Sequence, residues 1–486
     1  MSTEKIKQVP SAIIVNISQF FWGSSYYGMF GLLVAYFNKH LNISEAETMM
    51  ILGAFGALGP ILSALGGLFC DRFFGAKRGI LLGYMLYILS YISLAYAALE
   101  YSQILSLLAL SLTAFARGLS NTGPRTLIAK SYGSNQNVAM DSSFTYNYML
   151  NNLGSFTARI SFPILLVIIS YQGAFLLSGI LMVINVLILI FFKKHLISIG
   201  SDADFKPLTL KVIGAFLLAL GGLVALINLS FNYLDITKNV VYVLAVAVFG
   251  FFIFEMTKST VSEKKKMLVV LILLLQTLLF FLFYNLLYTA VIFYAINTMD
   301  TNFFGFSINP LVTQSFNPFW IIIVSPILAY IFSALEKNNK NPTIFTKFAI
   351  GLLFSSMAFL VLFISGLFPM ENGRIASFWF LIAHFFQATA ELLISALGVS
   401  ALVRLTPKRS TGFVVGLQLV TLSVTSVFSA VLSQQVALPK GEHTMAEILG
   451  VYSPFFAYMS IIAFVGVIIT LLLVPVCKKI VNSAEE

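Results

Sequence analysis

The stretch Gly66-Gly-Leu-Phe-Cys-Asp-Arg-Phe-Phe-Gly-Ala-Lys-Arg-Gly79 joins two long apolar runs of the chain. Its first glycines allow two helices to approach closely, and a later glycine can supply a tight turn. An acidic residue at this place can cap a helix or pair with the basic residues around it. We expect this charged segment to break and reform contacts when groups of helices move. The predicted cytoplasmic gate consists of Asp71, Arg72, Lys77 and Arg78.

The composition indicates a polytopic membrane protein. Of the 486 residues, 59% are hydrophobic and only 10% are charged, whereas soluble domains carry about 25% charged residues. We expect an all-α protein with fourteen transmembrane helices. Most of the 29 Lys and Arg residues fall in alternate connecting segments. This distribution predicts that both termini are cytoplasmic, and it explains the net charge of +10 without a nucleic-acid partner.

The polar segment from Ile197 to Pro207 divides the chain near its middle. We therefore predict an N-terminal six-helix bundle over residues 1–196 and a cytoplasmic connection with an inserted helix pair over 197–265. A C-terminal six-helix bundle is predicted over 266–486. Two six-helix halves around a central cavity form the major facilitator fold, and the Gly66–Gly79 stretch resembles the signature loop of major facilitator transporters.

The first apolar span is polar in its middle. It runs from Ser11 to about Phe37, and its small and polar residues are Asn16, Gln19, Gly23, Ser24, Ser25, Tyr26, Tyr27 and Gly28. Lipid offers no partners for such groups, so we expect this face to contact protein or a water-filled cavity. The alternative is that these residues only allow helices to pack closely.

Several motifs together resemble the proton-dependent oligopeptide transporter family. The first is Trp22-Gly-Ser-Ser-Tyr-Tyr-Gly-Met29, followed by the Asp71 loop. Later motifs are Asp141-Ser-Ser-Phe-Thr-Tyr-Asn-Tyr-Met-Leu-Asn-Asn-Leu-Gly-Ser155, Gln314-Ser-Phe-Asn-Pro-Phe319 and Ala390-Glu-Leu-Leu-Ile-Ser395. The resemblance covers nearly the whole chain. It implies a secondary active transporter of di- and tripeptides or peptide-like small molecules that works by alternating access, with proton coupling left open.

The resemblance also implies a substrate site made mainly of neutral groups. The candidate substrate-binding residues are Tyr26, Tyr27, Asn152, Tyr288, Asn317, Glu391 and Ser395. Glu391 lies about halfway along an otherwise apolar span, where a carboxylate costs roughly 2.5–3.5 kcal/mol or more and indicates a functional site. We therefore take Glu391 as the candidate proton carrier. The alternative is a neutral acid bonded to a neighbouring helix.

The chain departs from the family pattern where charges are expected. Phe20, Gly23 and Ser24 stand in place of the family's Glu-x-x-Glu-Arg, and Gly123 stands in place of a lysine that precedes a proline. These replacements keep two other functions open, a facilitator or exporter of another small metabolite and a transport-inactive membrane sensor.

Two further charges, Arg117 and Arg159, fall within predicted spans. Either can pair with Glu391 or face an anionic substrate, and Arg159 can instead steady the bundle or reach an interface.

The remaining expectations concern chemistry and location. The four histidines show no metal-ligand spacing, and the two cysteines imply no disulfide framework. We see no nucleophile motif, so we expect no enzyme activity, no metal and no cofactor. The predicted partners are a peptide-like small molecule and the lipid bilayer. We expect a monomer in the bacterial inner membrane.

Overall fold

The computed structural model of the protein describes residues 8–133, 136–303, 305–338, 340–406 and 411–482. These residues form helices α1 to α15 together with short 3-10 and π-helical turns. The strands in the described part are β1 (Asn302–Phe303) and β2 (Phe306–Ser307), which pair antiparallel. The predicted all-α class is therefore confirmed.

Within the described residues, 12 helical segments are long and apolar enough to cross a membrane. The helix α1 (Pro10–Ala35) is not among them, although it has 26 residues, because polar groups interrupt its apolar sequence. The helix α6 (Asn137–Phe191) runs for 55 residues and contains a break at Ser170, where φ is 53° and ψ is −179°. The count of fourteen transmembrane helices stays a prediction.

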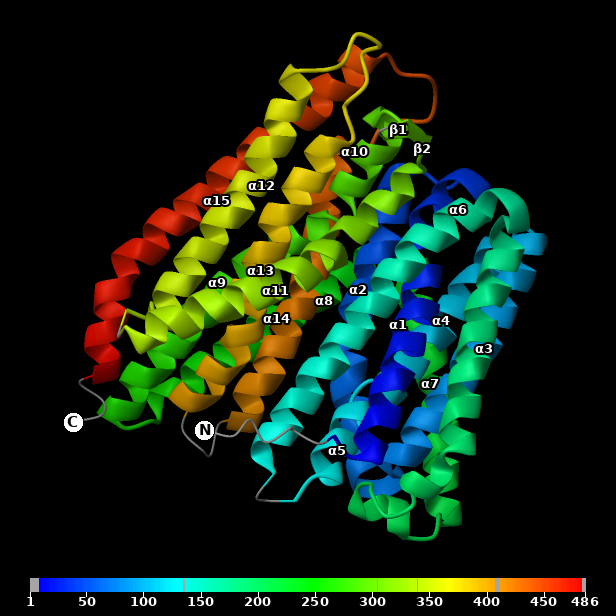
Figure 1. The fold of residues 1–486 in the computed structure, drawn as a ribbon, viewed down its shortest axis with the longest axis vertical. Coiled ribbons are helices and arrows are strands. Elements are labelled where there is room, and N and C mark those ends of the chain that lie inside the picture. Colours follow the sequence, from blue (N-terminus) through cyan, green and yellow to red (C-terminus); the bar gives the residue numbers. More distant parts are fainter. Residues whose placement is uncertain (1–7, 134–135, 304, 339, 407–410, 483–486) are drawn as a thin grey trace. The chain divides into compact units, whose positions relative to one another are not determined.

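The first of two compact units contains residues up to Ile43 and Leu58–Leu234. Besides α1 and α6, it holds α3 (Ala76–Leu99), α4 (Gln103–Ser120), α5 (Gly123–Ser131) and α7 (Leu210–Asn232). Along the length of this unit α1 packs against α6, and α3 packs against both α4 and α6 (Figure 1). The helix α2 (Glu45–Phe69) contributes residues to both units.

Glycines allow the backbones of this first unit to approach each other closely. A Cβ atom on Gly154 of α6 would lie 2.2 Å from the carbonyl oxygen of Phe20 in α1. A Cβ atom on Gly66 of α2 would lie 2.2 Å from the carbonyl oxygen of Gly118 in α4. No side chain fits at such distances, so each glycine permits one helix–helix contact.

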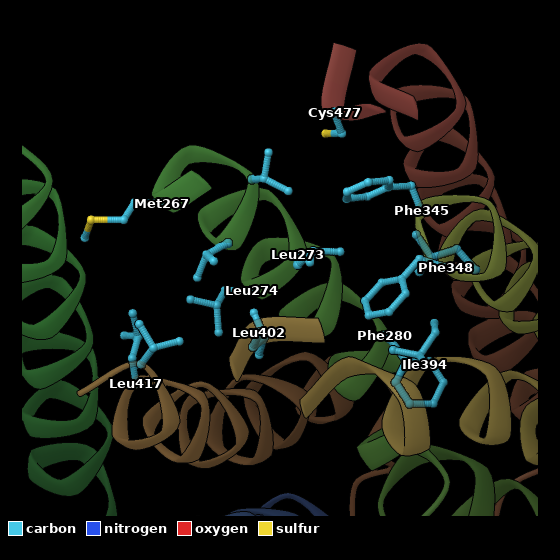
Figure 2. Packing of buried hydrophobic residues seen from close by; sticks show 14 of the residues in the cluster. Met267, Leu273, Leu274, Phe280, Phe345, Phe348, Ile394, Leu402, Leu417 and Cys477 are labelled. Atoms are coloured by element: carbon cyan, nitrogen blue, oxygen red, sulfur yellow. The ribbon is translucent and has the colours of Figure 1, made fainter. Parts of the chain in front are cut away.

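The second unit contains Ser44–Ala57 and the residues from Asp235 onward. Its helices are α8 (Leu234–Thr257), α9 (Val261–Leu286), α10 (Ala290–Thr298), α11 (Phe316–Lys337), α12 (Ile344–Leu367), α13 (Phe378–Leu405), α14 (Thr411–Ser433) and α15 (Met445–Asn482). Its buried core lies around α9, where Leu273 and Phe280 pack among side chains of α12, α13, α14 and α15 (Figure 2). Close packing of these buried side chains fixes how the helices of this unit contact one another.

The two helices expected to form an inserted pair pack in different units. Phe216 of α7 stacks on Phe74 with the ring centroids 5.4 Å apart. Phe252 of α8 packs against Phe413 of α14 at 6.3 Å. The predicted domain boundaries, at 196 and 265, stay a prediction.

Candidate functional site

One face of α1 carries a stack of aromatic rings. Trp22, Tyr26 and Phe30 are spaced four residues apart, so they lie above one another on the helix surface. The Trp22 and Tyr26 ring centroids are 5.1 Å apart, those of Tyr26 and Phe30 are 5.9 Å apart, and both pairs are nearly parallel at 6°. Tyr27 meets Tyr26 edge-on at 5.1 Å. The predicted residues Tyr26 and Tyr27 therefore lie together.

Two arginines from other helices approach these tyrosines. Arg117 of α4 donates a hydrogen bond from Nη1 to the Tyr26 hydroxyl at 2.8 Å, and its Cζ lies 5.0 Å from the Tyr26 ring centroid. Arg159 of α6 is only 3% exposed, and its Cζ lies 4.7 Å from the Tyr27 ring centroid. Arginine is well suited to such stacking because its guanidinium is planar and weakly hydrated. Burial against Tyr27 favours the alternative in which Arg159 faces the interior of its unit, rather than reaching an interface.

Room for Arg117 comes from Gly59 of α2. A Cβ atom there would lie 2.8 Å from Nη1 of Arg117. Within the described part of the chain, Arg117 forms no ion pair, and its Nε has no hydrogen-bond partner. A guanidinium with unused donors can bind a carboxylate bidentately. Together with Tyr26 and Tyr27, the two arginines make the first unit a candidate site for an anionic group.

Other polar groups of α1 are satisfied by neighbouring helices. Asn16 donates to the Ser143 hydroxyl at 3.1 Å and accepts from the Asn147 amide at 3.1 Å. Ser25 donates to the carbonyl oxygen of Ser178 at 2.7 Å. These hydrogen bonds connect α1 to α6. Asn16 and Ser25 therefore fit the alternative interpretation of this span, in which its polar residues serve helix packing.

Asn152 lies on α6, where the sequence predicted a substrate contact. Its amide nitrogen donates to the carbonyl oxygen of Tyr148 one turn earlier, at 2.9 Å. This bond belongs to its own helix, and the residue is partly exposed. Asn152 therefore contributes a half-exposed amide to the first unit.

In the second unit, the structure brings two predicted residues together. The Asn317 amide of α11 donates to Oε2 of Glu391 in α13 at 3.2 Å. Asn317 is buried and Glu391 is half-buried within a 28-residue helix. A carboxylate at this depth, with an amide donor to steady it, can accept a proton or bind a cation.

The two other residues predicted for the second unit lie on α13 and after α9. Ser395 follows Glu391 by one turn on α13, so the two lie on the same helix face. Tyr288 follows the end of α9, and its hydroxyl lies 3.0 Å from that of Tyr284. The structure therefore places the Tyr288 hydroxyl within hydrogen-bond distance of Tyr284, which lies in the last turn of α9.

Of the four predicted gate residues, two are exposed and two form hydrogen bonds to a distant segment. Asp71 and Arg72 lie in a π-helical turn, Cys70–Phe74, and both are exposed. Within the described residues Asp71 forms no ion pair, and its role in the gate stays a prediction. Lys77 and Arg78 begin α3 and contact the segment that follows α6.

This segment, residues 196–206, caps the start of α3 through Ser201 and Asp204. Asp204 accepts hydrogen bonds from the backbone nitrogens of Lys77 at 3.0 Å and Ser201 at 2.9 Å. The Ser201 hydroxyl accepts from the Ala76 nitrogen at 3.0 Å. The first amides of α3, which have no partner within the helix, are thus satisfied by a segment more than 120 residues later.

The side chains of the gate reinforce this contact. Lys77 Nζ donates to the carbonyl oxygens of Leu196 at 3.1 Å and Ile197 at 3.0 Å. Arg78 donates to the carbonyl oxygens of Ala203 at 3.1 Å and Lys206 at 2.7 Å. We name this assembly of residues 76–78 with residues 196–206 the linker clamp. Sequence reasoning missed Asp204, although Ser201-Asp-Ala-Asp204 is the spacing of a capping box.

Comparison with known proteins agrees with this architecture. Residues 77–449 match the sequence pattern of the POT family. Dipeptide and tripeptide permease B of Edwardsiella piscicida is 30% identical over 465 residues, which are 95% of this chain and 94% of the permease. Dipeptide and tripeptide permease A of Pectobacterium carotovorum is 30% identical over 479 residues, 98% and 93% of the two chains.

The fold is also similar to solved structures. A crystal structure of tetrameric PepTSo2 superposes with a TM-score of 0.87 at 25% sequence identity, over 96% of this chain and 98% of that chain. The apolar helices and these bacterial relatives make the protein an integral membrane protein and not an enzyme. By a match that extends over most of its length, the chain belongs to the POT family.

Proposed function

We propose that this protein is a secondary transporter that carries di- and tripeptides or peptide-like small molecules by alternating access. The observation that carries the proposal is the match of almost the whole chain to permeases of dipeptides and tripeptides. The membrane is the bacterial inner membrane, and both termini are cytoplasmic, an orientation supported by the Lys and Arg distribution. The transporting unit is a single chain.

Each unit, taken by itself, carries groups that suit one end of a small zwitterion. A peptide presents a carboxylate at one end and an ammonium group at the other. Arg117 and Arg159 of the first unit offer guanidinium groups for the carboxylate, beside the Tyr26 hydroxyl. Glu391 of the second unit, held by Asn317, offers a carboxylate for the ammonium group. Within the first unit Tyr27 and Asn152 add a hydroxyl and an amide group, and within the second unit Tyr288 and Ser395 add hydroxyl groups.

Proton coupling, in this proposal, depends on Glu391. The positions of the family's charged first-helix motif hold Phe20, Gly23 and Ser24, which cannot titrate. Glu391 lies within a membrane-spanning helix, where protonation removes the cost of a buried charge. The same replacements favour a second candidate function, in which the protein is a facilitator or exporter of another small metabolite.

Uptake into proteoliposomes tests the proposal. We expect labelled dialanine to accumulate under an inward proton gradient, and a protonophore at fixed membrane potential to reduce the accumulation. Free dialanine should compete better than its C-terminal amide or its N-acetyl derivative, because each capped form lacks one charge. If no peptide is taken up or competes while another metabolite is carried, the second candidate function replaces the first.

A variant of Arg117 tests the carboxylate end of the peptide separately from the ammonium end. Arg117→Gln should reduce the preference for free dialanine over its amide by roughly tenfold, the effect of about 1.4 kcal/mol, and should leave the preference over N-acetyl-dialanine unchanged. Arg125→Gln, on the exposed side of α5, is the matched control. An equal loss of both preferences in Arg117→Gln would argue against a carboxylate contact.

A further inference from the structure

A cavity of about 260 Å³ lies in the first unit, beside the linker clamp. Its apolar lining comes from three helices and includes Ile80 and Leu81 of α3, Leu127 of α5 and Leu189 of α6. Pockets for drug-sized molecules are typically about 300–1,000 Å³. This cavity is therefore large enough for part of an aliphatic chain, but not for a whole drug-sized molecule.

Two lysines also line this cavity. Lys193 follows the end of α6, is exposed, and forms no ion pair within the described residues. The Lys77 ammonium group has carbonyl oxygens as acceptors and lies 4.8 Å from the Phe205 ring centroid, so its positive charge is not cancelled by an ion pair. Asp204, which lies close to Lys77, is bonded to backbone amides. No acidic residue belongs to the described lining.

The surface next to the cavity is apolar and exposed. Phe191 is 74% exposed, and Ile197, which also lines the cavity, is 65% exposed, although both are large hydrophobic residues. They flank Lys193 and Lys194 at the end of a membrane-spanning helix. Such a change from apolar to basic residues is typical of the boundary between the hydrocarbon core and the lipid headgroups.

We propose that this cavity binds one anionic phospholipid of the surrounding leaflet. The phosphodiester contacts Lys193 and Lys77, and the first part of an acyl chain packs against Ile80, Leu81 and Leu189. Basic pockets between transmembrane helices bind anionic headgroups in this way. A free phosphate ion would use the lysines but leave the apolar lining unoccupied. Phosphatidylcholine has the same phosphodiester, but its choline group would place a further positive charge beside the lysines. The inference does not depend on which substrate the protein carries.

Lipid binding to the purified full-length protein in detergent tests this site. We expect short-chain phosphatidylglycerol to bind more tightly than phosphatidylcholine of the same chain length, as measured by native mass spectrometry. Lys193→Gln should weaken phosphatidylglycerol binding about fivefold, the effect expected for one lysine near a lipid phosphate. Lys194→Gln is the matched control, because Lys194 is the next residue and does not belong to the cavity lining.

A second variant tests the apolar part of the site. Leu81→Trp places a larger side chain in the cavity and should weaken phosphatidylglycerol binding while leaving both lysines in place. Equal weakening in Lys193→Gln and Lys194→Gln would overturn the proposal, because it would mean diffuse attraction to a basic surface. Equal binding of phosphatidylcholine, or competition by inorganic phosphate as strong as that by the lipid, would also overturn it.

Discussion

Replacing Asp204 by alanine should release the start of α3 from the segment that follows α6. The carboxylate accepts hydrogen bonds from the backbone nitrogens of Lys77 at 3.0 Å, Ser201 at 2.9 Å and Arg78 at 3.4 Å. Alanine accepts none of these bonds. The side chains of Lys77 and Arg78 bond to carbonyl oxygens, so they remain as a weaker second attachment.

The expected effect is moderate because Asp204 is half-exposed. Removing a capping side chain typically costs about 0.5–2 kcal/mol, and a hydrogen bond to a charged group contributes about 1.5–3 kcal/mol. Water can replace part of the lost bonding at a half-exposed site, so we expect a loss of about 2 kcal/mol in the free energy of local opening. This corresponds to a roughly 30-fold increase in the open population.

Hydrogen–deuterium exchange measures this population directly. In Asp204→Ala, the amides of residues 76–78 and 201 should exchange roughly 30-fold faster than in the unmodified protein. The matched control is Asp202→Ala, since Asp202 is exposed and lies in the same 3-10 turn. Exchange that rises less than about threefold in Asp204→Ala, or equally in both variants, would refute the role of this carboxylate.

Three further changes test the two units separately. Glu391→Gln keeps the shape and the amide contact but can neither titrate nor offer a carboxylate to an ammonium group, so gradient-driven uptake in proteoliposomes should fail and dialanine affinity should fall about tenfold; unchanged uptake and affinity would make Glu391 a structural acid. Tyr26→Phe removes the 2.8 Å bond to Arg117 and keeps the ring stack, so dialanine affinity measured by calorimetry should fall about tenfold; an unchanged affinity would contradict the proposed site. Gly154→Ala adds a Cβ atom 2.2 Å from a carbonyl oxygen of α1 and should destabilise the protein by about 1–3 kcal/mol in thermal unfolding. In Gly222→Ala the added Cβ would meet nothing within 4 Å, so a similar loss in that control would rule out helix crowding as the cause.

Much of the candidate site was predictable from local sequence. Tyr26 and Tyr27 interrupt an apolar span with polar groups, and Glu391 is a carboxylate within another apolar span. Each is unusual because placing a polar group in lipid costs free energy. That cost can be judged from the type of residue and its position in the span, without knowledge of the tertiary structure. The same reasoning marked Arg117 and Arg159 as charges within the membrane, but it left their partners open.

The partners were decided by tertiary structure. Arg117 meets Tyr26 because α4 and α1 belong to one packed unit, 91 residues apart along the chain. Sequence reasoning considered only the neighbours of Asp71 along the chain, whereas the carboxylate that caps the start of α3 is Asp204, 127 residues after Lys77, whose backbone nitrogen donates to it. The role of Asp71 in the gate stays a prediction.

The sequence by itself determined the all-helical membrane class and which residues are costly to place in lipid, because both follow from composition and from the polarity of single spans. Only the tertiary structure decided that Asn317 bonds Glu391 and that Arg159 stacks on Tyr27. The physical reason is that hydrogen bonds and ring stacking act over a few ångströms, and helix packing alone brings residues so distant in sequence to that range.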